Sequence, residues 1–287
     1  MRAKVDIRPV PSALRNVAAL GLLVPWVACH GTAVPPYGAL LAESFTLPSA
    51  CLTETRRVNV YTPPGYTESA TTAFPVLYMP DGGLAEDFVH VAEAVHTGIQ
   101  WGLVRPMLVV GIENTARRRD LTGPTEAARD RAIAPVVGGS AAFRSFLRDE
   151  LMPEVARRYR VTDETGLIGE SLAGLFVVET FLLEPALFDH CIAFDPSLWW
   201  NDRALVRTAA ERLRGRPELR ATLYLANSGE PEIAAATKEL TEAIAPVAPR
   251  GLAWSWQPMP EQFHDTIYRA AAPLALRSVF AAPAEAK

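Results

Sequence analysis

The sequence is poor in several features that would each point to a different class of protein. Its 28 lysines and arginines are outnumbered by 32 acidic residues, which gives a net charge of −4. No basic run is long enough to follow a phosphate backbone, so nucleic acid is not expected as a partner. The densest basic cluster, Arg117 to Arg119, is interpreted as a solvated loop rather than an anion site. No internal repeat is present, which excludes solenoids and propellers.

Cysteine is also scarce, and the three cysteines lie far apart in the sequence at positions 29, 51 and 191. Cys29 lies in the N-terminal segment described next, so Cys51 and Cys191 are left for the folded part. Free buried thiols are expected for this pair, although an oxidising compartment would permit a disulfide between them.

The N-terminal segment lacks an apolar run long enough to span a bilayer. A basic flank precedes an uncharged apolar run at 17–28, and small residues follow to Ala33. This pattern is typical of a secretory signal. Residues 1–34 are therefore predicted to be an export signal and linker, cleaved near Ala33 or lipidated at Cys29. The protein is expected in the periplasm, on the envelope or outside the cell, with a lipid on Cys29 as its only link to a membrane.

From residue 57 onward, short apolar strands alternate with segments of helical spacing. Predicted strands are 57–61, 75–79, 107–112, 165–168, 190–194, 221–226 and 254–257. Predicted helices are 86–103, 141–159 with a break at Pro153, 172–183, 231–245 and 266–280. The first strand is expected to be antiparallel and the continuous apolar runs to be central parallel strands. Residues 35–287 are thus predicted to form one α/β domain, with a mostly parallel sheet covered by helices on both faces.

A small-x-Ser-x-small sequence lies between one such strand and the next helix, at Gly169 to Ala173. This is the context of a nucleophile elbow, in which a serine occupies a strained strand-to-helix turn. The residues two before and two after the serine must be small to avoid collision, and Gly169 and Ala173 meet that demand. Gly174 adds to the pattern. Ser171 is therefore the candidate nucleophile.

A serine nucleophile needs a base, and in a fold of this kind the base follows the last strand. His264 is the only histidine in that part of the chain, whereas His30, His90, His96 and His190 are interpreted as structural or solvated.

An orienting carboxylate should follow a strand between Ser171 and His264. Glu230 and Glu232 both come directly after the strand at 221–226, and Glu232 is preferred. Asp195, at the end of the strand after the elbow helix, is the third candidate.

The backbone N–H of Leu172 is expected to help stabilise an oxyanion because it lies at the start of the helix after the serine. Gly82 and Gly83, in the loop after the strand at 75–79, are candidates for a second donor. Trp199 and Trp200 are candidates for the wall of a substrate pocket, or for core packing.

Taken in order, these motifs resemble the esterase D-like branch of the α/β hydrolases, which includes the enterochelin (ferric-siderophore) esterases. The resemblance covers most of residues 45–280 and rests on five stretches: 57–66, 75–83, the elbow, 196–200 and His264. It implies an α/β-hydrolase fold with Ser171 and His264 as nucleophile and base and Glu232 in the place of an acid. The chain departs from the pattern at Glu170, where relatives often have His, and at Asp195, where a Ser commonly precedes the Pro-Ser pair.

The expected function is therefore a serine carboxylic-ester hydrolase that forms an acyl-enzyme at Ser171, acting on a small-molecule ester such as a siderophore or another multi-ester. No metal or organic cofactor is implied. Two alternatives remain open: acyl transfer to an acceptor hydroxyl, and a catalytically silent envelope protein that binds a ligand.

Overall fold

The computed structural model describes residues 42–283. These residues belong to one compact unit. The predicted export signal at 1–34, including Cys29, lies outside the described residues. Within them, no helix is both long enough and apolar enough to cross a membrane.

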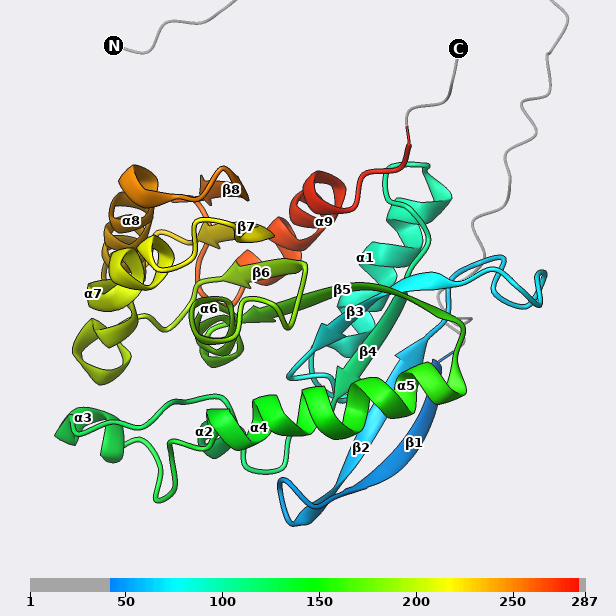
Figure 1. Ribbon diagram of the computed structural model, residues 1–287, viewed down its shortest axis with the longest axis horizontal. Coiled ribbons are helices and arrows are strands. Elements are labelled where there is room, and N and C mark those ends of the chain that lie inside the picture. The colour runs from blue at the N-terminus through cyan, green and yellow to red at the C-terminus, as the bar shows by residue number, and fades with distance from the viewer. Residues whose placement is uncertain (1–41, 284–287) are drawn as a thin grey trace, which may run out of the picture. The chain divides into compact units, whose positions relative to one another are not determined.

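The core of the fold is an eight-stranded sheet with the order β1-β2-β4-β3-β5-β6-β7-β8 (Figure 1). The strands are β1 (Ala42–Ser49), β2 (Glu54–Tyr61), β3 (Phe74–Met79), β4 (Leu108–Ile112), β5 (Val161–Glu170), β6 (His190–Phe194), β7 (Arg220–Asn227) and β8 (Gly251–Pro258). β2 pairs antiparallel with β1 and with β4, and every other pairing is parallel. The mostly parallel sheet predicted from the sequence is confirmed.

Helices cover both faces of this sheet. One layer holds α1 (Phe88–Gln100) and α9 (Ile267–Val279). The opposite layer holds α4 (Ser140–Phe146), the π-helical turn η1 (Leu147–Leu151), α5 (Met152–Arg158), α6 (Leu172–Leu183), α7 (Trp200–Arg214) and α8 (Pro231–Ile244). Shorter helical pieces are α2 (Arg117–Asp120), α3 (Ala128–Arg131) and the 3₁₀ turn η2 (Ala245–Val247).

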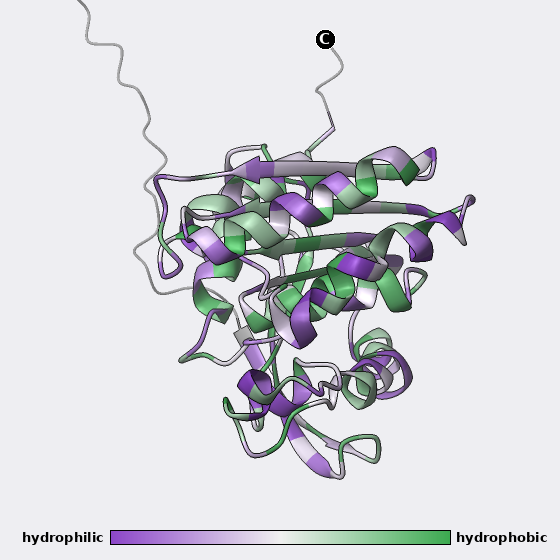
Figure 2. Ribbon diagram, turned by 90° about the vertical axis from the view of Figure 1, so that its left-hand side faces the viewer, coloured by the Kyte–Doolittle hydropathy of each residue, from purple (hydrophilic) through white to green (hydrophobic). Residues whose placement is uncertain are grey.

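Alternate residues of the central strands point into the two layers, which explains their unbroken apolar runs. In β3, Val76 and Tyr78 pack with the α4 to α8 layer, whereas Leu77 and Met79 pack with α1 and α9. Because both faces are covered, a polar residue at any of these positions would be buried. Figure 2 accordingly shows the central strands largely in the hydrophobic colour.

The structure differs from the sequence prediction in several places, among them the short helical pieces α2, α3 and η2, which were not predicted. β1 was not predicted, and neither was α7, whose start at 201–203 has positive φ values of 49, 50 and 61° and therefore breaks the helical pattern. No break occurs at Pro153, because this proline lies in the first turn of α5, where its missing N–H costs little. The π-helical turn just before it keeps the chain helical from α4 onward.

Cys51 and Cys191 are free thiols, as expected, but only Cys191 is buried, whereas Cys51 is partly exposed. Cys51 lies in the turn after the edge strand β1, and Cys191 lies in β6, five strand positions away. At about 4.8 Å per strand that separation is roughly 24 Å, far beyond the reach of a disulfide. Burial raises the pKa of Cys191 to about 12, which makes its thiol unreactive.

Candidate active site

Ser171 lies in the sharp turn between β5 and α6. Its backbone has φ 61° and ψ −120°, a conformation that L-residues rarely adopt. A Cβ on Gly169 would lie 2.7 Å from the Cβ of Ala173, and one on Gly174 would lie 2.7 Å from the carbonyl oxygen of Phe194. The small residues around the serine are therefore required by close packing, as the elbow pattern predicts.

His264 lies in the loop between β8 and α9, which is fastened to the end of β7. The Met259 N–H donates to Asn227 O at 2.8 Å, and the Gly229 N–H donates to Gln262 O at 3.0 Å. A Cβ on Gly229 would lie 2.4 Å from the carbonyl oxygen of Pro260, so the loop can approach this closely only because residue 229 is glycine. These contacts hold the imidazole over the carboxyl edge of the sheet.

The imidazole of His264 connects Ser171 to a buried carboxylate. Its Nε2 lies 3.1 Å from Ser171 Oγ, and its Nδ1 lies 2.9 Å from Asp195 Oδ2. Asp195 is fully buried at the end of β6, in a turn where its φ is 41°. Ser228, at the end of β7, fixes this carboxylate by donating its N–H to Oδ1 at 2.6 Å and its Oγ–H to Oδ2 at 2.7 Å.

The structure does not bring Glu232, the preferred acid of the sequence analysis, to the histidine. Its side chain is 50% exposed in the first turn of α8 and pairs with Arg129 at 3.1 Å. Glu230, the residue before α8, is also exposed. Both carboxylates lie at the helix N-terminus, where the helix dipole stabilises them in contact with solvent. Of the three carboxylates left open by the sequence, Asp195 is the one hydrogen bonded to His264.

Three carboxylates shape the electrostatics around the imidazole. The hydrogen bond to Asp195 raises the pKa of His264, burial opposes this, and the negative charges of Glu170 and, more weakly, Glu230 raise it further. Burial raises the pKa of Glu170 itself to about 7, opposed by the positive charge of the imidazole.

The candidate oxyanion donors have different environments. Leu172 begins α6, and its N–H has no carbonyl four residues back within the helix to accept it. Gly83 donates its N–H to Glu86 Oε2 at 2.7 Å, a solvent-exposed carboxylate that a substrate oxygen could replace. The prediction for Gly82 is wrong, because its N–H donates to the carbonyl oxygen of Ile112 at 2.9 Å.

Gly82 instead permits the loop after β3 to pack on β4. A Cβ at this position would lie 2.3 Å from the Cα of Gly111. The preceding residue, Asp81, has a φ of 55° and accepts two hydrogen bonds of 2.7 Å from Arg117. Arg119 likewise donates to Asp120 at 2.6 Å. The prediction of a solvated basic loop is therefore wrong for these two arginines, and Arg117 braces the turn that carries the candidate oxyanion donor Gly83.

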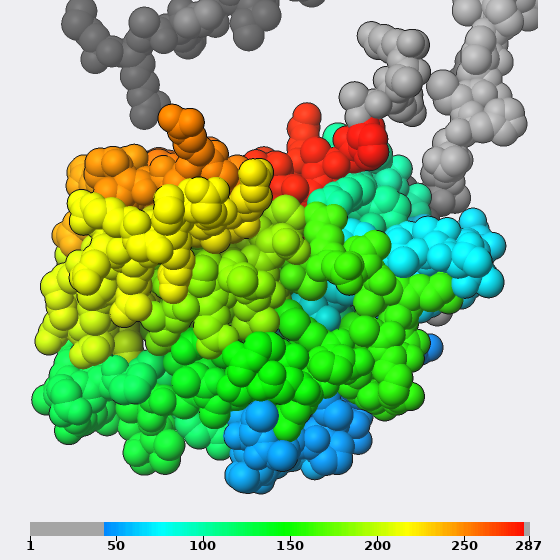
Figure 3. Space-filling model, in the orientation of Figure 1, coloured from blue at the N-terminus to red at the C-terminus, as the bar shows by residue number. Residues whose placement is uncertain are grey.

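The two tryptophans have separate environments. Trp200 is buried and donates its Nε1–H to Gly123 O at 2.9 Å, so it anchors the segment 117–139 to α7 and is not a pocket wall. Trp199 is partly exposed, and the guanidinium of Arg129 lies 4.9 Å from the centre of its ring. Figure 3 shows the segment 117–139 against the start of α7 on the molecular surface.

Two exposed apolar side chains were not anticipated from the sequence. Leu84, 49% exposed, directly follows Gly83, and Phe263, 66% exposed, directly precedes His264. The sequence did carry a signal for both, because each apolar residue is the direct neighbour of a candidate site residue. Large apolar side chains exposed next to a reactive centre are typical of substrate contacts.

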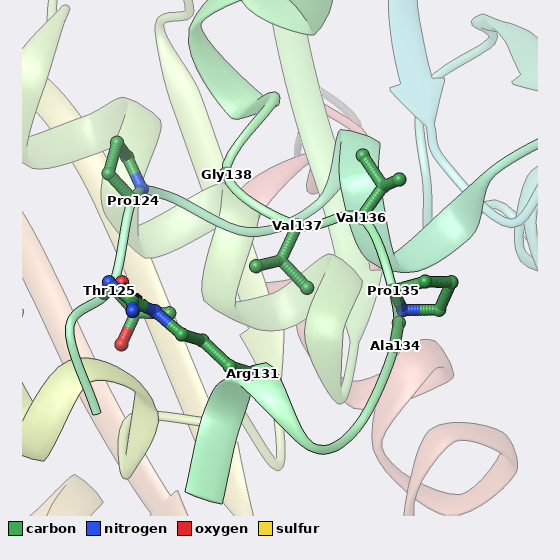
Figure 4. A pocket seen from close by; sticks show the side chains of 8 residues that line it. All are labelled: Pro124, Thr125, Arg131, Ala134, Pro135, Val136, Val137 and Gly138. Carbon is green, nitrogen blue, oxygen red and sulfur yellow. Dashed lines mark hydrogen bonds between the residues drawn. The ribbon is translucent and has the colours of Figure 1, made fainter. Parts of the chain in front are cut away.

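A cavity of about 410 Å³ lies within the segment 124–138, where Arg131, Val136 and Val137 contribute to its lining (Figure 4). Neither Ser171 nor His264 lines it. The hydrogen-bonded serine and histidine, and not this cavity, therefore define the candidate active site.

Within residues 42–283, the one cluster with metal-ligand spacing consists of Glu170, Asp195 and His264. Both imidazole nitrogens lie within hydrogen-bonding distance of side chains, Nδ1 of Asp195 and Nε2 of Ser171. The arrangement is that of a histidine between a hydroxyl and a carboxylate, as in acyl transfer to a serine.

The chain resembles known proteins over most of its length. Residues 49–250 match the family described as "Putative esterase", well over half of the chain. The chain belongs to this family. It is 30% identical over 187 residues to the ferri-bacillibactin esterase BesA of Bacillus subtilis, covering 56% of this chain and 62% of the relative. It is 36% identical over 99 residues to the siderophore triacetylfusarinine C esterase of Aspergillus fumigatus, covering 33% of this chain and 32% of the relative. The matches thus span less than two thirds of either relative.

Solved structures show the same fold. An IroE-like serine hydrolase from Shewanella oneidensis superposes with a TM-score of 0.75 at 25% identity, covering 83% of this chain and 80% of that one. The enterobactin esterase FES from Shigella flexneri superposes with a TM-score of 0.64 at 19% identity, covering 86% of this chain and 61% of that one. The α/β-hydrolase fold and the family resemblance predicted from the sequence are confirmed.

Proposed function

We propose that this protein is a serine carboxylic-ester hydrolase that works through an acyl-enzyme at Ser171. The observation that carries the proposal is the continuous contact from Ser171 Oγ through His264 to the buried carboxylate of Asp195. Membership of an esterase family supports it.

In the proposed mechanism, His264 Nε2 takes the Ser171 proton while Oγ attacks the ester carbonyl carbon. Asp195 stabilises the imidazolium, and the N–H groups of Leu172 and Gly83 stabilise the oxyanion. The protonated imidazole then gives its proton to the departing alcohol, which leaves an acyl ester on Ser171. A water molecule, deprotonated by the same imidazole, releases the acid and regenerates the serine.

We further propose that the substrate is a siderophore or another compound with several ester bonds. The support comes from relatives named as esterases of ferri-bacillibactin and triacetylfusarinine C. Leu84 and Phe263 offer exposed apolar surface next in sequence to Gly83 and His264, which suits a substrate with bulky acyl groups.

The test is labelling of the folded protein with a fluorophosphonate, followed by peptide mapping, together with an aryl-acetate assay of the wild type, Ser171→Ala and His264→Ala. We expect label on Ser171 and loss of turnover in both variants. A folded protein that neither labels nor turns over ester would overturn the proposal in favour of ligand binding. Competition between aryl acetate and trilactone or triester siderophores then tests the substrate class.

We also propose export of the mature protein, on the strength of the signal-like residues 1–34. Fractionation of cells that express the full chain tests this. A Cys29→Ser variant that moves from the membrane fraction to the soluble exported fraction would identify Cys29 as a lipid anchor, and an unchanged distribution would exclude the anchor.

A further inference from the structure

The carboxylate of Glu170 is a buried ionisable group beside the candidate catalytic residues that the mechanism above does not use. Glu170 ends β5 directly before Ser171, and its side chain is 15% exposed. Its Oε1 lies 3.3 Å from His264 Nδ1 and has no hydrogen-bond partner among the described residues. Because Asp195 Oδ2 lies 2.9 Å from the same nitrogen, one side of the imidazole faces two carboxylates.

The backbone holds Glu170 in this place. β5 and β6 are neighbouring parallel strands in which Glu170 pairs with Phe194, so Asp195 follows one residue beyond that pair. The side chains of Glu170 and Asp195 thus converge at the carboxyl ends of adjacent strands, where the His264 loop passes. A buried carboxylate without a hydrogen bond costs free energy unless a positive charge lies close to it.

The imidazolium form of His264 is that positive charge. Groups that face Glu170 come from every element packed against it: Asp87 before α1, Arg117 in α2, Asp195 after β6, His264 before α9 and Tyr268 in α9. The guanidinium of Arg117 is already engaged by two hydrogen bonds to Asp81. The remaining neighbours are acidic or uncharged, which leaves the imidazole as the group whose protonation Glu170 stabilises. The imidazole is also acted on by Asp195 and, more weakly, by Glu230 before α8, whose negative charges raise its pKa as well.

We propose that Glu170 is a second carboxylate partner of His264, a positioning residue that shares with Asp195 the stabilisation of the imidazolium. Its effect on the reaction rests on the proposed serine esterase function, whereas the contact itself does not. An ionised Glu170 makes the free histidine harder to deprotonate, so the esterase becomes active only at higher pH. The same charge stabilises the imidazolium of the transition state and raises the rate once the base is free.

The first test is the dependence of kcat/KM on pH for the wild type, Glu170→Gln and the matched control Glu261→Gln, an exposed carboxylate in the same loop as His264. A charge this close to a titrating group typically shifts its pKa by about one unit or more. We expect Glu170→Gln to move the acid limb down by about one pH unit and to lower the plateau about tenfold, with no shift in Glu261→Gln. If Glu170→Gln lowers the plateau of kcat/KM but leaves the pH of the acid limb unchanged, Glu170 has a merely structural role and the proposal is overturned.

The second test needs no turnover. The imidazole titration of His264 is followed by NMR in full-length Ser171→Ala and in Ser171→Ala/Glu170→Gln. We expect the double variant to titrate about one unit lower and in a single step, because the coupling between two titrating groups is gone. Equal titrations overturn the role of Glu170 even if the wild type is an active esterase. A shifted titration in a protein without turnover supports the contact while the esterase function itself fails.

Discussion

Replacing Asp195 by Asn should disable the protein through the wrong tautomer of His264. Ser228 donates its N–H to Asp195 Oδ1, so the Asn carbonyl oxygen must stay at that position. The Asn NH₂ group then takes the place of Oδ2, 2.9 Å from His264 Nδ1. An NH₂ group can only donate there, so Nδ1 becomes an acceptor and the ring proton moves to Nε2. That nitrogen faces Ser171 and can no longer take its proton.

The expected magnitude follows from this change of tautomer. An Asp to Asn change in a serine protease triad lowers kcat about 10⁴-fold through the same change of tautomer. This corresponds to an increase of about 5.4 kcal/mol in the activation free energy, at 1.36 kcal/mol per factor of ten. Because Asn has the same shape as Asp, the fold should persist. We therefore expect Asp195→Asn to lose about 10³- to 10⁴-fold in kcat for aryl acetate at pH 8.

Glu232→Gln is the matched control, because Glu232 was the acid favoured by the sequence pattern. Its exposed ion pair with Arg129 contributes at most about 1 kcal/mol to stability, so kcat should stay within about twofold of the wild type. Rates are normalised to the fraction of folded protein, from circular dichroism. A loss of more than tenfold in Glu232→Gln, or a retained tenth of the activity in Asp195→Asn, would refute the assignment of Asp195.

Three further outcomes follow from the same contacts. Asp195→Ala removes the amide that misdirects the imidazole and leaves Glu170 beside Nδ1, so we expect this variant to keep about tenfold more activity than Asp195→Asn. The double variant Asp195→Ala/Glu170→Gln should lose this advantage in the same assay. Glu170→Gln should raise the free energy of unfolding by about 2 to 3 kcal/mol at pH 8 and by little at pH 4.5, measured by urea denaturation. The sign follows because burial raises the pKa of Glu170 to about 7, so the folded protein loses stability as pH rises from about 4.5 to 7. Gly82→Ala should lower the free energy of unfolding by at least about 1 to 3 kcal/mol in the same urea experiment, because the added Cβ would lie 2.3 Å from the Cα of Gly111. An unchanged urea midpoint would contradict this packing argument.

Much of the fold could be predicted because the pattern that encodes it is local. The central strands are continuous apolar runs between helices, and the elbow is a short motif whose steric demands fall on its own neighbours, Gly169 and Ala173. β1 was missed because it is an edge strand with a mainly exposed alternating pattern. α7 was missed because it begins with three residues in the left-handed region and because its surface is rich in charged side chains.

The acid could not be chosen from the sequence because the choice depends on contacts between distant residues. Asp195 and Glu232 each follow a strand after the elbow, and strand order alone allows either to reach the histidine. The difference lies in Ser228, which supplies two hydrogen bonds to Asp195 and none to Glu232, and in Arg129, which holds Glu232 in solvent. The same limit applied to Gly82, since only the fold shows that Ile112 accepts its N–H.

The position of the acid also accounts for the glutamate directly before Ser171. With the acid at the end of β6, its side chain and that of the residue before the nucleophile meet on the same side of the imidazole, because β5 and β6 are neighbours. A glutamate at position 170 therefore reinforces an acid at position 195. Its burial costs stability above neutral pH, so Glu170 serves the imidazolium and not the stability of the fold.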